Sequence, residues 1–234
     1  MFFLDPSPWA GTPHPQAVVG GPACWPPDLP WPTSADGVPM RPLLTLHEAL
    51  FLIPTLPTGH VVTAFAPHHP GRHNADLRAC ALHRNQRLPP LRRGQWQEPP
   101  HDADDGLSGD GLRVLLHPQA PSQVHGDTWP ALQLTRRSAT DAELREEQAG
   151  DYEGLDASKL FGRARWLQDP IDEHNSQHFI LQLRERDLAQ ADSAYDGLWN
   201  DGTLYLVLNH GLRHPNGALR WPVGLCGRAF VQFS

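Results

Sequence analysis

The spacing of apolar and polar residues predicts a chain built mainly from short β-strands. Runs rich in branched and aromatic residues recur along the sequence, and turn-forming residues separate them. The predicted strands are HVVTAFAP at 60–67, LRVLLHP at 112–118, ALQLT at 131–135, HFILQLR at 178–184, TLYLVLN at 203–209 and RAFVQFS at 228–234. Positions 204–208 are all apolar, so we expect both faces of that strand to be covered.

Two stretches have helical spacing instead, TLHEALFLI at 45–53 and TDAELREEQ at 140–148. In each, a threonine precedes a glutamate by three residues, which is the capping-box pattern of a helix start. The pairs are Thr45 with Glu48 and Thr140 with Glu143. Strands outnumber helices and no regular strand-helix-strand alternation is visible. The sequence therefore predicts an α+β fold with a mostly antiparallel β-sheet core and a few short helices.

The stretch VVGGPACWPPDLPWPTSADGVPM at 18–40 is rich in proline and tryptophan. Because proline fixes φ and donates no backbone N–H, neither a long helix nor a central strand can pass through it. Disordered linkers are poor in large aromatic rings. We therefore expect an ordered N-terminal arm that packs across the core, with Trp25 and Trp31 as its anchors.

Residues 68–111 are polar and turn-rich, and their hydrophobic pattern is weak. They predict irregular structure, either within the fold or as a large insertion. A domain boundary near residues 95–111 is an alternative. A single domain over residues 1–234 with one continuous core is the preferred interpretation.

Charge and composition narrow the function classes. The chain has 26 acidic and 19 basic residues and a formal net charge of −7, which disfavours nucleic-acid binding because phosphates require a basic surface. The N-terminus lacks the basic flank of a secretory signal, and no run approaches the ~20 apolar residues of a membrane span. We therefore expect a cytoplasmic protein without membrane contact. The three cysteines lack a C-x-x-C spacing and are interpreted as reduced core residues.

Few residues are candidates for catalysis. His68, His69, His73 and His83 form the densest histidine group, but a loop flanked by proline fixes no ligand geometry, so a solvated loop is preferred over a metal site. Asp201 is either an acid at the start of a strand or, in the sequence Asn-Asp-Gly, a turn former. No nucleophile, phosphate-loop or zinc motif is present. We therefore expect no enzyme activity, no cofactor and no metal, with a metal-assisted hydrolase as the alternative.

The stretch at 18–40 resembles the opening signature of the YwqG-like family of bacterial domains of unknown function. That signature is a Gly-Gly-x-Pro start, then Trp-Pro, then Asp-Gly-x-Pro. KLFGRARWLQD, FILQL and LWNDGTLYLVL resemble later family elements, so the matches cover about 18–53 and 158–209. The matching residues, to which the resemblance assigns a structural role, are Gly20, Gly21, Trp31, Asp36, Gly37, Lys159, Gly162, Gln168, Gln182, Trp199 and Asp201. The chain departs from the pattern where Asn200 and Thr203 replace glycine and Thr45 replaces glutamine.

The family includes immunity proteins of bacterial polymorphic-toxin and type VI secretion systems. The resemblance thus implies a protein that binds one effector toxin and neutralises it without catalysis. Acidic segments at 98–110 and 139–156 favour such a partner, since acidic surfaces steer association with the basic clefts of toxins that attack nucleic acids. Simple solvation of these charges is the alternative for each segment. The hypothetical toxin-binding residues are Asp102, Asp104, Asp105, Asp110, Glu143, Glu146, Glu147, Asp151 and Glu153. A housekeeping scaffold with another partner is a third interpretation.

Overall fold

The structure is a computed structural model. It describes residues 1–11, 15–34, 36–51, 56–67, 112–123, 128–150, 154–167, 177–209 and 224–232. The region at 68–111, where the sequence predicts irregular structure, lies outside these ranges.

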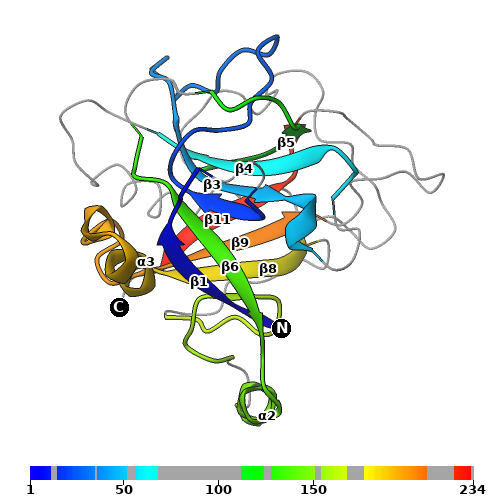
Figure 1. Ribbon diagram of the computed structural model, residues 1–234, viewed down its shortest axis with the longest axis vertical. Coiled ribbons are helices and arrows are strands. Elements are labelled where there is room, and N and C mark those ends of the chain that lie inside the picture. Colours follow the sequence, from blue (N-terminus) through cyan, green and yellow to red (C-terminus); the bar gives the residue numbers. More distant parts are fainter. Residues whose placement is uncertain are drawn as a thin grey trace.

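The described strands form one sheet of 11 strands in which every neighbouring pair is antiparallel (Figure 1). The spatial order is β10-β5-β4-β3-β2-β6-β1-β7-β8-β9-β11. The strands are β1 (Phe2–Pro8), β2 (Ala17–Val19), β3 (Arg41–His47), β4 (His60–Ala66), β5 (Arg113–Pro118), β6 (Leu132–Ser138), β7 (Lys159–Leu160), β8 (Gln177–Arg184), β9 (Thr203–Asn209), β10 (Gly224–Leu225) and β11 (Gly227–Gln232). The helices are α2 (Asp141–Ala149), α3 (Glu185–Ala191) and the single-turn η1 (Glu48–Leu50) and η2 (Ser193–Tyr195). The predicted α+β class with a mostly antiparallel core is confirmed.

The sheet closes on itself through its last stretch of chain. Strand β10 pairs with β5 and strand β11 pairs with β9, yet only Cys226 separates the two strands. The backbone N–H of Cys226 donates to the carbonyl of Val114 in β5 at 3.0 Å, so the stretch joins both ends of the strand order. The inward faces of the strands enclose one large apolar core, in which Leu44, Leu116 and Leu206 are almost fully buried.

All six strands that the sequence predicts are confirmed, as is helix α2 with its capping box. The helix predicted over 45–53 is wrong, because residues 41–47 form β3 and only η1 follows. Strand β3 pairs with β2 on one side and β4 on the other, and residues 42–47 are all buried. A short isolated helix is marginal, so pairing on both sides overrides the local helical pattern.

Strand β1 is not among the strands that the sequence predicts, and it contains Pro6 and Pro8. The structure explains how it tolerates them. Both prolines lie opposite β6, whereas β7 pairs only with Phe2 and Phe3. The prolines therefore stand where β1 has a partner strand on one side only, which is where a missing N–H is accepted.

A second apolar cluster lies on the outer face of β4 and β5, where residues of the stretch at 20–40 cover the sheet. Trp25 is 1% exposed and contacts the Phe65 ring edge-on at 5.3 Å between centroids. Trp31 meets the same ring at 5.5 Å, and Met40 and Leu115 complete the cluster. We call residues 20–34 and 36–40 the Pro/Trp segment.

No helix within the described ranges is both long enough and apolar enough to span a membrane.

Candidate functional site

Three of the predicted toxin-binding residues lie within the described ranges, and all three are on helix α2. They are Glu143, Glu146 and Glu147. The helix lies beyond the strands, at the bottom of Figure 1. The Thr140 hydroxyl accepts from the backbone N–H of Glu143, and the Glu143 carboxylate accepts from the backbone N–H of Thr140 at 2.8 Å. These reciprocal bonds fix the start of the helix.

Glu143 is also tied to the sheet. Both of its carboxylate oxygens accept from the Arg137 guanidinium of β6 at 3.1 Å, a two-point contact. The Arg137 group in turn lies 4.4 Å from the centre of the Phe3 ring. Hydrogen bonds from Arg137, together with those from Thr140, lower the pKa of Glu143 to about 2. Glu143 therefore remains ionised, but a basic side chain of this protein already accompanies it.

Glu147 does not lie on the surface, and its assignment to toxin contact is corrected. Its side chain is buried, and both oxygens accept from the ammonium group of Lys159, at 2.9 and 2.7 Å. The backbone N–H of Leu155 donates to it at 2.6 Å, and that of Arg163 donates as well. Although burial alone would raise it, these donors hold the pKa of Glu147 below its ordinary value. Glu147 thus anchors the C-terminal part of α2.

The remaining predicted partner contacts divide into two groups. Glu146 is exposed on α2. Asp141, which belongs to the acidic segment at 139–156 but not to the predicted contacts, is also exposed, in the first turn of the helix. The others lie outside the described residues, and they are Asp102, Asp104, Asp105, Asp110, Asp151 and Glu153.

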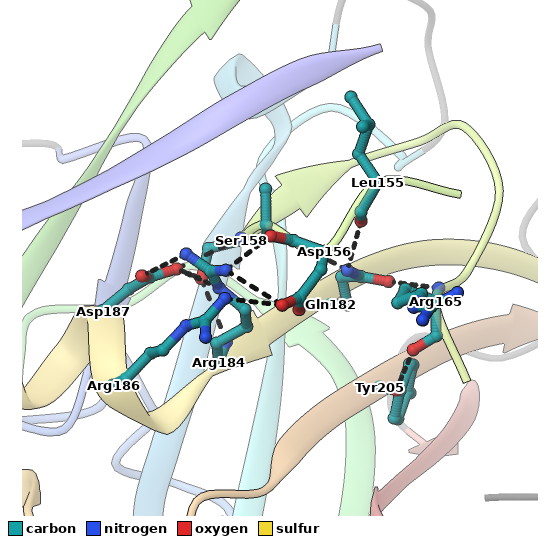
Figure 2. A network of polar contacts seen from close by, with 10 residues as sticks. Leu155, Asp156, Ser158, Arg165, Gln182, Arg184, Arg186, Asp187 and Tyr205 are labelled. Carbon is teal, nitrogen blue, oxygen red and sulfur yellow. Dashed lines mark hydrogen bonds and ion pairs between the residues drawn. The ribbon is translucent and has the colours of Figure 1, made fainter. Parts of the chain in front are cut away.

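The chain around Lys159 has little regular structure, and side chains bind its backbone groups (Figure 2). We call residues 154–167 the Lys159 segment. Gln182 of β8 donates to the carbonyls of Leu155 and Ala157 and accepts from the N–H of Arg165 at 2.8 Å. The Tyr205 hydroxyl donates to the Arg165 carbonyl. Gln182 is fully buried. Its side-chain amide gives backbone groups of the Lys159 segment the hydrogen bonds that a neighbouring strand would otherwise supply.

Charged groups hold the middle of the Lys159 segment against α3. Asp187 accepts from the Ser158 hydroxyl at 2.6 Å and forms an ion pair with Arg184 at 2.5 Å (Figure 2). Arg184 also lies 3.5 Å from Asp156, which Arg186 contacts at 2.5 Å. These carboxylates are matched by cations of the same protein.

Three of the family-like glycines stand where no side chain fits. Gly20 and Gly21 both have φ of +65°, and a Cβ on Gly20 would lie 2.7 Å from the carbonyl oxygen of Pro130. Gly162 has φ of +91°, and a Cβ there would lie 2.5 Å from Oε1 of Glu147. The Lys-x-x-Gly pattern therefore places a cation beside Glu147 and leaves room for the carboxylate.

The Trp-Pro and Asp-Gly-x-Pro elements form the end of the Pro/Trp segment. The indole N–H of Trp31 donates to the Met40 carbonyl at 2.8 Å. The Ser34 hydroxyl donates to Asp36, and Gly37 adopts φ of +80° in the turn. These residues close a loop back onto itself.

Asp201 is exposed and in a left-handed conformation, with φ of +58°. Its backbone N–H points at the buried carboxylate of Glu185, 3.4 Å away, and Gly197 and Trp199 donate backbone N–H groups to the same carboxylate. The Trp199 side chain is fully buried. The carboxylate that organises this turn thus belongs to Glu185, and Asp201 supplies a donor to it.

Gln168 and the four clustered histidines, His68, His69, His73 and His83, lie outside the described residues. Within the described part of the chain, no three His, Cys, Asp or Glu side chains are placed to share a metal ion. No known family model and no curated protein matches the sequence.

Sequence reasoning missed the partnership of Lys159 with Glu147 and the role of Glu185. One signal was available for the first, because Lys159 is the only lysine among 19 basic residues. The flexible side chain of lysine can carry its compact ammonium group into a buried site, which sets a single lysine apart from the arginines of the chain. No local pattern distinguishes Glu185 from the other acids.

Proposed function

We propose that this protein is a cytoplasmic immunity protein of the YwqG-like family. In this proposal it binds a cognate effector toxin of a type VI secretion or other polymorphic-toxin system and neutralises it without catalysis. The observation that carries the proposal is helix α2. This charged helix has one buried residue, Glu147, and the helix is fixed at both ends.

The attachment of α2 suits a binding surface. Its start is fixed by the capping box and by Arg137, and its C-terminal part by Glu147 in contact with Lys159. A surface element that is already ordered loses little conformational freedom when a partner binds. The exposed carboxylates of Asp141 and Glu146 then face a basic surface on the toxin, as expected of an enzyme that attacks nucleic acids.

The proposal gives the Pro/Trp segment an architectural role, as an arm laid over the sheet. The contacts of Trp25 and Trp31 with Phe65 support this role, because they cover an outer face that would otherwise expose apolar side chains. Helix α2 is attached to the closed sheet itself, through the contact of Glu143 with Arg137 of β6.

Co-expression tests the proposal directly. The toxin encoded beside the gene is expressed with and without this protein, and both growth and co-purification are scored. Restored growth together with a stable complex is expected. Growth arrest in the presence of folded, abundant protein contradicts immunity. If the gene has no toxin neighbour, the housekeeping scaffold is favoured instead.

The role of α2 is tested by charge reversal. The double variant Asp141→Lys/Glu146→Lys should slow association with the toxin several-fold at low salt and less at high salt, because charge steering is screened. The control Asp28→Lys/Asp196→Lys makes the same charge change at exposed positions outside α2. Equal kinetics for both double variants would remove α2 from the interface while leaving immunity itself intact.

A further inference from the structure

A cleft of about 260 Å³ lies beside the Pro/Trp segment, over the outer faces of β2 and β3. Trp9, Pro15, Pro22, Ala120 and Pro121 contribute apolar surface to it, and Val18, Thr45 and His47 come from the strands. Cys24 and Ser122 also line the cleft, with Sγ and Oγ 3.7 Å apart. The lining includes no Asp, Glu, Lys or Arg among the described residues. The cleft therefore suits a neutral group.

A line of three buried polar side chains runs from this cleft across the sheet. Thr45 Oγ1 lies 3.2 Å from Thr63 Oγ1, which lies 2.9 Å from Nε2 of His117. The other ring nitrogen of His117, Nδ1, lies 2.9 Å from the Pro118 carbonyl oxygen. All three side chains are at most 1% exposed. The His117 ring is covered by Trp25, with 4.5 Å between ring centroids.

The chemistry of His117 fixes the direction of every hydrogen bond in this line. Burial lowers the pKa of His117 to about 4, so the ring is neutral at pH 7 and carries one N–H. A carbonyl can only accept, so the proton is on Nδ1 and Nε2 accepts. Thr63 must then donate to Nε2, and its oxygen accepts from the Thr45 hydroxyl. The Thr45 oxygen, its proton already used, is left with the role of an acceptor, and Thr45 is one of the residues that line the cleft.

We propose that this cleft binds a small neutral aromatic molecule with a single hydrogen-bond donor, of the phenol type. The donor meets the Thr45 oxygen, and the ring lies against Trp9 and the prolines, whose flat faces suit aromatic contact. An apolar cavity of about 150 Å³ holds benzene, so the cleft of about 260 Å³ has room for one substituted ring. This site is separate from α2 and does not depend on the proposed immunity function.

A pair of nearly identical probes tests the donor requirement. Binding of p-cresol and of its methyl ether, 4-methylanisole, is measured by amide chemical-shift titration of the full chain. For a ligand of this size we expect p-cresol to bind with a Kd of about 1 mM. The ether, which lacks the donor, should bind at least tenfold more weakly. The shifts should map to the residues that line the cleft.

Two variants locate the effect. Thr45→Val removes the acceptor while keeping the shape, so it should abolish the preference for p-cresol over the ether. Ala120→Trp fills the cleft without touching the line of hydroxyls and should abolish binding of both probes. Absence of shifts at the cleft, equal affinity of the two probes for the wild-type protein, or a preference that persists in Thr45→Val each overturns the proposal.

Discussion

The Pro/Trp segment and the Lys159 segment both have little regular structure, and both lie against the sheet, yet they are held in opposite ways. The first is fixed by ring contacts, since Trp25 lies against both Phe65 and the imidazole of His117. The second is fixed by side chains that bind backbone groups, of which Glu147 and Gln182 make the most contacts.

These two kinds of contact predict how each segment tolerates substitution. Apolar contacts are numerous and individually weak, so losing one group weakens the Pro/Trp segment by degrees. Buried polar groups depend on complete pairing, because a missing partner leaves a desolvated charge. We therefore expect sharp losses in the Lys159 segment and graded losses in the Pro/Trp segment.

The largest effect is expected for Lys159→Met. The methionine fits the space but leaves the Glu147 carboxylate buried without its cation, which should lower the free energy of unfolding by about 5 kcal/mol. Urea denaturation followed by circular dichroism measures the loss. Arg186→Met removes a cation from an exposed pair with Asp156 and should cost less than about 1 kcal/mol. Similar losses for both variants would show that the buried pair is not special.

Trp25→Ala comes next. The loss of a fully buried ring should cost about 4 kcal/mol, because the cavity beside Phe65 can close only in part. Trp31→Ala removes a half-buried ring of the same cluster and should cost less. If the comparison of the two segments holds, amide exchange in Trp25→Ala should speed up around residues 20–40 while the Lys159 segment stays protected. Equal loosening of both segments would contradict it.

The sequence predicted those elements whose patterns are local. Positions 204–208 of the strand at 203–209 are all apolar, and the α2 start carries its own cap, so neither needs information from elsewhere in the chain. Strand β3 was misread because its helical spacing is overridden by pairing on both sides.

The candidate site was harder to predict, because its meaning depends on partners distant in the chain. Glu146 and Glu147 are neighbours with the same chemistry, yet one is exposed and the other lies against Lys159. Adjacent residues of a helix lie on different faces, and the local sequence does not show which face is buried. The Thr45–Thr63–His117 line likewise joins three strands and leaves no local pattern.

Acid should weaken the Pro/Trp side of the molecule through His117. Its pKa is about 4 in the folded protein against 6.5 for a free side chain, so the unfolded chain takes up the proton first as pH falls. The resulting loss of stability begins near pH 6.5 and levels off near pH 4, amounting to about 2–3 kcal/mol by pH 4.5.

The measurement compares unfolding free energies at pH 7.5 and 4.5 for the wild-type protein and for His117→Gln, which does not titrate. The pH-dependent loss should be about 2–3 kcal/mol smaller in the variant. Since carboxylates titrate in both proteins, only the difference between their two pH-dependent losses reports the protonation of His117. Equal pH dependence would mean that the ring is hydrated in the folded state.

The smallest effect is expected at the start of α2, away from the Glu147–Lys159 pair that anchors the C-terminal part of the helix. Thr140→Ala removes the hydroxyl that accepts from Glu143 and should cost about 1 kcal/mol, felt mainly in the first turn. Gln148→Ala, at an exposed position of the same helix, should be nearly neutral. Hydrogen exchange should accelerate at the start of α2 in Thr140→Ala, while the amide of Leu155, bound to Glu147, stays protected. Because the cap and the buried ion pair lie at opposite ends of nine residues, loss of protection at both ends would show that α2 forms as one unit with the Lys159 segment.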